Sequence, residues 1–529
     1  MSAALAGREP ERRARPARGD LIAGLTVALV LIPQALAYAE LAGMPPERGL
    51  YAAAIPLLVA APLVSSPYLQ TGPVALTAVL TFGALGSLAE PGSDRYVELG
   101  LLLALVVGTA RAAVGLLRAG AIAYLMSRPM LLGFVPAAAT FICASQLPAA
   151  LGAEAPDGGV LESAWWALVH PGDWAAGAVA FAVLAVAAMA GGRRIHRLFP
   201  GVLLAVVAAI ALSELTGYGE DTVGSVDAGL PPLSLDLPWG DTWELLVPGV
   251  IIALVGFAEP AAIGRTFAAR DRVAWSADRE FVSQGAANVA AGLTGGLPVG
   301  GSLGRSTLNR QAGARSGWSG AVTGAIVLVL LPVSSVISPL PAAVLAAIVL
   351  VTVLPMVNLA AIARLWPTSR PATLIAVGTF AATLAFAPRI ERGVIAGVGL
   401  SVAVHLWREL RIDAESWLDG ETLNLRPQGV LWFGAVERLE DVLVEELSRH
   451  REASRLLLHL DSVGRLDITA ALVLRDLLAQ ARASGMEVEL AGVQERDERV
   501  VESVLLAEPR RPGRRRPRAP DELNTKPDT

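Results

Sequence analysis

Two ionisable side chains stand next to stretches of sequence that carry no charge. Glu259 follows the uncharged run 245–258 and precedes Pro260, and Arg305 lies just beyond a glycine-rich segment. Ionisable groups at membrane depth are costly, so by default they face the protein interior and have a function there. A guanidinium suits an oxyanion because its donors are paired, and a buried carboxyl can carry a proton reversibly. The structural alternative is a mutual salt bridge between these two residues.

Glycine and proline interrupt the hydrophobic sequence at places where half-helices could begin. Pro33 lies inside the first hydrophobic stretch, Pro73 opens the third, and several Gly and Pro residues cluster within 295–304. Because proline fits the first turn of a helix, Pro73 and the segment 298–302 predict half-helices that start inside the membrane. Such N-termini favour an anion, and two of them mark a transporter's substrate site. Close helix packing at small residues is the alternative.

The composition predicts the elements that position these residues. Of the 529 residues, 53% are AVILMFWYC and only 17% are charged. A soluble domain carries about 25% charged residues, so the composition argues against a soluble globular enzyme. Uncharged runs, together with the stretch 97–117, predict an all-α polytopic membrane protein with about fourteen spans.

Other classes of chemistry have no pattern in this sequence. The single cysteine, Cys143, excludes a disulfide scaffold and a cysteine-based metal cluster. Neither a Walker-type phosphate loop nor a nucleophile–base pair is visible. We therefore expect no enzyme activity, no cofactor, no metal site and no nucleic-acid partner.

Arginine predicts the orientation of the spans. With the N-terminus inside and fourteen spans, the even-numbered connections hold most loop arginines, and such an excess is typical of cytoplasmic loops. These arginines are Arg118, Arg128, Arg193, Arg194, Arg197, Arg265, Arg270, Arg272, Arg279, Arg310, Arg315, Arg364 and Arg370. No cleavage site follows the basic N-terminus, so we read no signal peptide. We expect a multi-pass protein of the cell (inner) membrane with both termini cytoplasmic.

The composition changes sharply beyond Trp407. Residues 408–508 alternate apolar strands with amphipathic helices and predict a small soluble α/β domain. The last residues are rich in proline and arginine, which is typical of disorder. The predicted organisation is a cytoplasmic basic N-terminus (1–19), a transmembrane transporter domain (20–408), a soluble domain (424–508) and a disordered tail (509–529).

Several long motifs resemble those of the SulP family of sulfate permeases and related anion transporters, in the family's order. They are Pro33-Gln34-Ala35-Leu36-Ala37-Tyr38-Ala39, Ala42-Gly43-Met44-Pro45-Pro46, Gly49-Leu50-Tyr51, the segment from Glu259 to Ala268 and the segment from Gly296 to Ser316. The resemblance covers about residues 20–508. It implies two inverted seven-span repeats, a core domain that carries the substrate against a gate domain, and a homodimer.

The resemblance also implies a site. In this family the anion lies between the starts of the third and tenth spans. The lining implied here is Gln34, Tyr38, Val74, Ala75, Ser302, Gly304, Arg305 and Ser306. The glutamate that matches Glu259 is associated with proton coupling in sulfate and dicarboxylate members, whereas sodium-coupled bicarbonate members carry an aspartate-rich eighth span. This chain departs from the family pattern twice, with Pro260 and Gly304 where serine is common.

The soluble domain resembles a STAS domain, the fold shared with anti-sigma-factor antagonists. The segment from Leu460 to Ala470 fits its strand–loop–helix. Thr469 falls at a position that is phosphorylated in some soluble relatives, which makes it a candidate regulatory phosphosite. As an N-cap of the following helix, Asp467 or Thr469 also has a sufficient structural role.

These observations predict a secondary transporter that imports a small inorganic oxyanion, sulfate, by proton symport. Arg305 and the two half-helices would bind the anion, and Glu259 would carry the proton. Sodium-coupled bicarbonate transport and proton-coupled C4-dicarboxylate transport are the alternatives within transport. A membrane-anchored regulator that uses its STAS domain to recruit a cytoplasmic protein, and no longer transports, is the alternative of another class.

Overall fold

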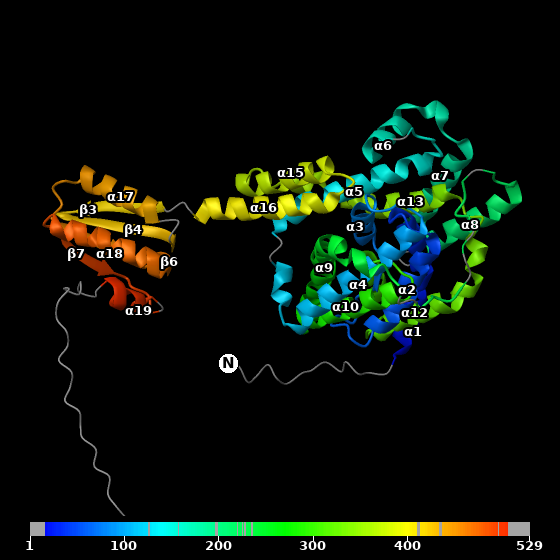
Figure 1. The fold of residues 1–529 in the computed structure, drawn as a ribbon, viewed down its shortest axis with the longest axis horizontal. Coiled ribbons are helices and arrows are strands. Elements are labelled where there is room, and N and C mark those ends of the chain that lie inside the picture. Colours follow the sequence, from blue (N-terminus) through cyan, green and yellow to red (C-terminus); the bar gives the residue numbers. More distant parts are fainter. Residues whose placement is uncertain are drawn as a thin grey trace, which may run out of the picture. The chain divides into compact units, whose positions relative to one another are not determined.

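The computed structural model describes residues 16–505 except 125–126, 157, 196–198, 220, 225, 227–228, 234–235, 410–412, 433–435 and 496 (Figure 1). Most of the basic N-terminus and the predicted disordered tail, 509–529, lie outside the described residues. The chain divides into two compact units, Met1–Ser401 and Val402–Thr529. Each unit is described separately below.

The first unit is helical. Its first half contains α1 (Arg18–Leu41), α2 (Pro46–Ala60), β1 (Thr71–Gly72), α3 (Ala75–Leu85), α4 (Asp94–Leu116), α5 (Arg128–Leu151), α6 (Val160–Val169), α7 (Ala176–Ile195) and α8 (Gly201–Thr216). Its second half contains α9 (Thr242–Asp271), α10 (Ala277–Leu293), β2 (Gly300–Gly301), α11 (Leu303–Gln311), α12 (Trp318–Leu330), α13 (Ala342–Val353), α14 (Leu359–Ala363), α15 (Arg370–Ala385) and α16 (Ile390–Glu409).

Many of these helices have the length and composition of membrane spans. Among the described residues, seven helices are long and apolar enough to cross a bilayer, and five shorter apolar helices accompany them. The predicted polytopic helical fold is therefore confirmed.

The two halves repeat the same order of elements. Each has a long helix that contains proline (α1 with Pro33, α9 with Pro260), then a second helix, a two-residue strand and a half-helix. The first two helices of each half pack against the fourth helix of the other half. Helices α1 and α2 contact α12, and α9 and α10 contact α4. Such reciprocal packing is what two repeats related by a two-fold axis produce.

The remaining helices of the first unit form a second group. Helix α5 packs against α13 and α15, and α7 packs against α8 and α13. The unit thus consists of one group built from α1–α4 with α9–α12 and another built from α5–α8 with α13–α16. These groups correspond to the predicted core and gate, and we use those names below. Helix α1 contacts α8 and α13, so the core meets the gate along α1.

A glycine in the first motif allows the backbones of α1 and α2 to touch. A Cβ atom at Gly49 would lie 1.9 Å from the carbonyl oxygen of Ala35, a separation that no side chain allows. Small residues at such crossings let membrane helices approach closely. The motif therefore fixes the position of α1, the helix that carries Gln34 and Tyr38.

Basic residues between α9 and α12 lie at the same end of the core as the start of α1. The Asp20 carboxylate accepts hydrogen bonds from the backbone N–H groups of Arg315 (2.7 Å) and Ser316 (3.0 Å). At the ends of α11 and α9, Arg310 forms an ion pair with Asp271. We refer to this end as the basic end of the core.

The second unit is an α/β domain. Its strands are β3 (Asp413–Asp419), β4 (Thr422–Leu431), β5 (Arg455–His459), β6 (Val463–Leu466) and β7 (Glu487–Ala491), and its helices are α17 (Val436–Arg449), α18 (Ile468–Ala483) and α19 (Glu498–Val500). The strand order is β3-β4-β5-β7, with β6 beside β4. Strand β3 is antiparallel to β4, and the other pairs are parallel. Buried leucines from the strands and from α17 and α18 form its core.

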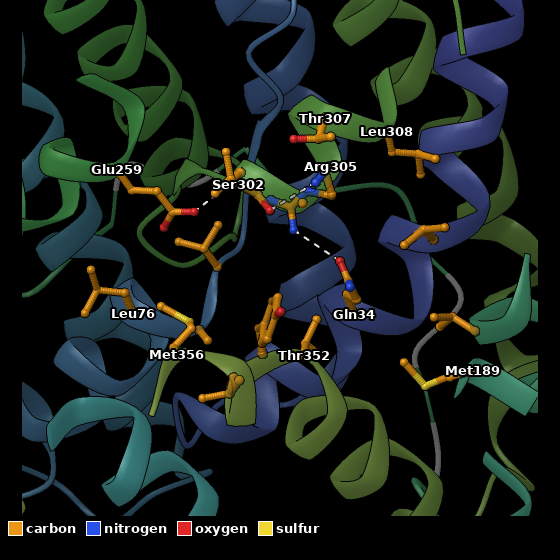
Figure 2. A pocket seen from close by; sticks show the side chains of 18 of the residues that line it. Gln34, Leu76, Met189, Glu259, Ser302, Arg305, Thr307, Leu308, Thr352 and Met356 are labelled. Carbon is orange, nitrogen blue, oxygen red and sulfur yellow. Dashed lines mark hydrogen bonds between the residues drawn. The ribbon is translucent and has the colours of Figure 1, made fainter. Parts of the chain in front are cut away.

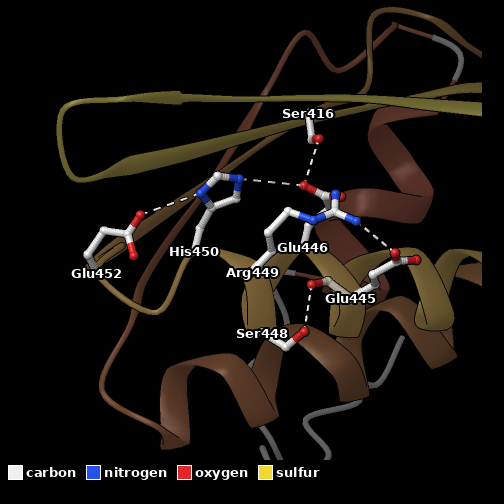
Figure 3. Close-up of polar contacts among 7 residues, drawn as sticks. All are labelled: Ser416, Glu445, Glu446, Ser448, Arg449, His450 and Glu452. Atoms are coloured by element: carbon white, nitrogen blue, oxygen red, sulfur yellow. Dashed lines mark hydrogen bonds and ion pairs between the residues drawn. The ribbon is translucent and has the colours of Figure 1, made fainter.

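The sheet of this domain begins earlier than residue 424, where the sequence analysis places the domain start. Strand β3 pairs with β4 over seven residues and also contacts α17 through a polar cluster (Figure 3). In that cluster Ser416 donates to Glu446 (2.8 Å), which is 7% exposed and also pairs with Arg449. Because Glu446 lies on α17, its contacts attach β3 to the rest of the domain.

Candidate substrate site

A cavity of about 500 Å³ lies between the core and the gate. Core residues on one side and gate residues on the other form its wall. The core contributes Val30, Gln34, Tyr38, Val74, Ala75, Leu76, Glu259, Ser302, Leu303, Gly304, Arg305, Thr307, Leu308 and Gln311. The gate contributes Met189, Phe199, Gly201, Val202, Thr352, Val353 and Met356. In Figure 2, Glu259 and Arg305 lie on either side of Ser302, and Thr352 and Met356 lie across the cavity from them.

The two half-helices begin side by side. Strands β1 and β2 pair antiparallel, with Thr71 opposite Gly301 and Gly72 opposite Gly300. The backbone N–H of Ser302 donates to the carbonyl oxygen of Gln70 (3.1 Å). The breaks that the sequence analysis singles out at Pro73 and at 298–302 therefore meet, although about 230 residues separate them in the chain.

Both half-helices direct their N-termini at the cavity. Val74 precedes the first residue of α3 and provides no side-chain cap, so the first N–H groups of α3 have no capping side chain. In α11 the hydroxyl of Ser302 accepts the N–H of Arg305 (3.4 Å). An N-terminus carries a partial positive charge, and the two charges add where the helices converge. The geometry therefore favours a negatively charged ligand.

Arg305 connects the two half-helices and α1. Its guanidinium donates to the carbonyl oxygen of Pro73 (2.9 Å) and to Oε1 of Gln34 (3.4 Å). The side chain is only 2% exposed, and its Nε has no hydrogen-bond partner in the described part of the chain. A buried donor without a partner is costly, and because this Nε has almost no accessible surface, an anion in the cavity would accept from it only after the side chain moved.

Glu259 contacts the N-terminus of α11. Its Oε1 accepts the backbone N–H of Leu303 at 2.8 Å, so the carboxylate stands where a bound anion would also be stabilised. The ion pairs between residues 16 and 505 that the structure describes do not include Glu259 with Arg305. The mutual salt bridge, the alternative interpretation of these two residues, is thus not formed.

One residue of the predicted lining lies outside the cavity. Gln34, Tyr38, Val74, Ala75, Ser302, Gly304 and Arg305 line it together with Glu259, but Ser306 does not. Ser306 is 0% exposed, and its hydroxyl accepts the backbone N–H of Gln70 (3.0 Å). Its role is structural, because this hydrogen bond attaches α11 to the strand that leads into α3.

Sequence reasoning missed the gate side of the cavity and the continuation along α11. Thr307, Leu308 and Gln311 follow Gly304 at helical spacing, so they share its face and extend the cavity toward the basic end of the core. That spacing was a usable signal. For Met189, Phe199 and Met356 there was none, because an apolar residue that faces a cavity looks the same in sequence as one that faces lipid.

In the α/β unit, Asp467 and Thr469 are the two residues that could cap α18 at its N-terminus. Asp467 precedes the first residue of α18, and its Oδ1 accepts the backbone N–H of Ala470 (2.6 Å). Thr469 is the second residue of the helix and is exposed. Asp467 is therefore the N-cap of α18, and Thr469 is not.

Two family models match this chain. The model described as "Sulfate permease family" matches residues 18–379, and the model described as "STAS domain" matches residues 418–508. A protein named probable sulfate transporter of Mycobacterium tuberculosis is 35% identical over 408 residues, which are 74% of this chain and 70% of that protein. The sodium-independent sulfate anion transporter of Bos taurus is 29% identical over 514 residues, with 90% and 83% coverage.

Solved structures share the fold. The murine solute carrier 26 family member A9 anion transporter, in the inward-facing state, superposes with a TM-score of 0.86 at 19% identity and covers 94% of this chain and 89% of its own. The transmembrane domain of a cyanobacterial bicarbonate transporter superposes with a TM-score of 0.63 at 23% identity, with 73% and 97% coverage.

Proposed function

Because this chain belongs to the sulfate permease family, we propose that it imports sulfate by proton symport, with the anion bound between α3 and α11 and the proton on Glu259. The observation that carries this proposal is the contact between the Glu259 carboxylate and the Leu303 N–H inside a cavity that also contains Arg305. A negative side chain and a negative substrate there compete for one positive helix end.

This competition supplies the coupling. While Glu259 is ionised, its charge opposes that of an arriving anion and occupies a donor of α11. When the carboxyl takes up a proton the repulsion is removed, and the N-terminus of α11, with Arg305, becomes available to the anion. Since each bound species then favours the other, the proton and the anion cross together. Uptake should therefore rise as the external pH falls below the internal pH.

The proposal is tested first by counterflow in proteoliposomes that contain the full chain. We expect labelled sulfate to exchange against internal sulfate. We also expect an inward proton gradient, with the external pH below the internal pH, to drive sulfate accumulation, and a sodium gradient to have no such effect. Bicarbonate that accumulates only with sodium, or succinate that accumulates with protons better than sulfate does, would support the corresponding alternative substrate. A chain that exchanges none of the three anions would favour the membrane-anchored regulator.

Gly304 offers a test of which residues face the anion. A Cβ atom at this position would lie 4.0 Å from the hydroxyl oxygen of Ser302, its nearest neighbour, so Gly304→Ser adds a hydroxyl to the cavity without a clash. One added hydrogen bond to an anion is worth about 1 kcal/mol, so we expect the KM for sulfate to fall roughly fivefold. Gly304→Ala is the matched control, and an equal change in both variants would argue against contact with the anion.

Four further features belong to the proposal. Arg310 and Arg315 both lie at the basic end of the core, where α1 starts. Because basic residues are enriched on the cytoplasmic side, this supports a cytoplasmic position for that end, and hence cytoplasmic termini in an inner membrane. The homodimer and a cytoplasmic protein partner of the STAS domain rest on the family resemblance. The exposure of Thr469 supports its role as a regulatory phosphosite, since a phosphate there would lie at the N-terminus of α18.

A further inference from the structure

A second buried guanidinium lies near the site but does not line the cavity. Arg111, in α4, is 0% exposed. Its Nε donates to the carbonyl oxygen of Ala253 (3.0 Å), its Nη2 to that of Ile252 (3.2 Å) and its Nη1 to that of Val299 (2.8 Å). All three acceptors are backbone groups of the second repeat, so α4 of the first repeat holds α9 and the segment before β2 together.

These contacts reach positions next to the proposed anion site. Val299 directly precedes β2, and Ala253 and Ile252 lie one to two turns before Glu259 in α9. A Cβ atom at Gly256 would lie 2.6 Å from Nη2 of Arg111 and 3.2 Å from the methyl group of Thr77, in the first turn of α3. The guanidinium is therefore surrounded by α3, α9 and the segment that leads into α11.

The backbone of Val299 is held by two side chains, those of Arg111 and Asn288. Asn288, in α10, accepts the N–H of Val299 (2.9 Å) and donates to its carbonyl oxygen (3.0 Å), the same oxygen that accepts from Arg111. Asn288 thus holds the same carbonyl oxygen of Val299 as Arg111 does, but without a charge. This pair of side chains allows the effect of position to be separated from the effect of charge.

The charge of Arg111 is not neutralised nearby. The ion pairs in the described ranges of the chain do not include Arg111, and its three acceptors are uncharged carbonyl oxygens. A buried charge is screened much less by salt than an exposed one. Its attraction therefore reaches an anion bound at the half-helices, and it acts on a divalent anion twice as strongly as on a monovalent one.

We infer that Arg111 sets the preference of the site for divalent over monovalent anions, through a fixed positive charge that never touches the substrate. It is a positioning and specificity-determining residue, not part of the binding surface. This inference rests on the proposed binding of an anion between α3 and α11.

The experiment measures the affinities of the purified full chain for sulfate and for nitrate, from the concentration dependence of thermal stabilisation. The variants are Arg111→Met and Arg111→Gln, which remove the charge, Arg111→Lys, which keeps it but loses the planar fork, and Asn288→Ala, which loosens Val299 without changing any charge. At an effective dielectric constant of about 20, a unit charge about 10 Å away changes monovalent affinity roughly tenfold and divalent affinity by the square of that factor.

We therefore expect the sulfate-to-nitrate affinity ratio to fall about tenfold in the neutral variants and to stay unchanged in Arg111→Lys and Asn288→Ala, whatever their loss of stability. An equal fall in Asn288→Ala, or an unchanged ratio in the neutral variants, overturns the inference. If the neutral variants do not fold, Arg111→Lys decides: a preserved ratio supports the inference, and a lowered ratio overturns it. Failure of the unaltered chain to bind sulfate would instead contradict the proposed function.

Discussion

The Glu259→Gln variant is expected to lose sulfate accumulation driven by a pH gradient while its level in the membrane stays normal. Glutamine keeps an oxygen that can accept the Leu303 N–H, so the local fold is preserved, but it cannot bind and release a proton. Because the side chain is permanently neutral, sulfate should still exchange in counterflow, at a rate that no longer depends on pH.

Glu40→Gln is the matched control for that experiment. Glu40 lies near the end of α1 and is not among the residues that line the cavity. Its neutralisation should leave the response to a pH gradient unchanged. Full pH-driven accumulation in Glu259→Gln, with the same pH profile as the unaltered chain, would remove Glu259 from the coupling mechanism.

The Arg305→Ala variant is expected to weaken the apparent affinity for sulfate about 100-fold, or close to 3 kcal/mol. The substitution removes a buried cation and the only described Nε donor without a partner in the cavity wall. Arg305→Lys keeps the charge but loses the planar, bidentate fork, so we expect an intermediate loss of about tenfold. The measurement is the KM of sulfate uptake, with the amount of folded protein determined in parallel.

Arg310→Ala separates this effect from general damage to α11. Arg310 lies on the same short helix but pairs with Asp271 outside the cavity. Its loss should leave the KM for sulfate within about twofold of the original value, because the anion does not contact it. An unaltered KM in Arg305→Ala, or an equal rise in both variants, would show that Arg305 does not bind the anion.

The sequence was sufficient to predict the half-helices because their signals are local. The proline and the cluster of glycines that interrupt the hydrophobic runs can be recognised without a partner. The position within the helix was wrong, however, because Pro73 precedes the N-cap Val74 and is not in the first turn of α3, and α11 begins only at Leu303. Charge-free runs likewise predicted the helical membrane fold, which the structure and its structural neighbours confirm. Strand β3, which precedes the predicted domain start at residue 424, is joined to the soluble domain by contacts with β4 and α17 that a linear reading does not reveal.

Features that depend on tertiary packing were not predictable. The contact of Glu259 with Leu303 joins residues 44 positions apart, and Ser306 is kept out of the cavity wall by its buried hydrogen bond to Gln70. Arg111 was overlooked because a lone arginine in a moderately apolar stretch does not reveal its depth. Its importance follows only from three carbonyl oxygens contributed by the other repeat.

The short ladder between β1 and β2 has a consequence for how the proposed substrate anion would cross the bilayer. Main-chain hydrogen bonds join Thr71–Gly72 to Gly300–Gly301, and buried side chains on both sides reinforce them. Since separating these strands would leave buried amides unpaired, we expect the proposed anion-binding groups at the starts of α3 and α11 to stay together throughout transport. We therefore expect intrinsic affinity to be the same from either face of the membrane, so that the gradients alone decide the direction of net flow.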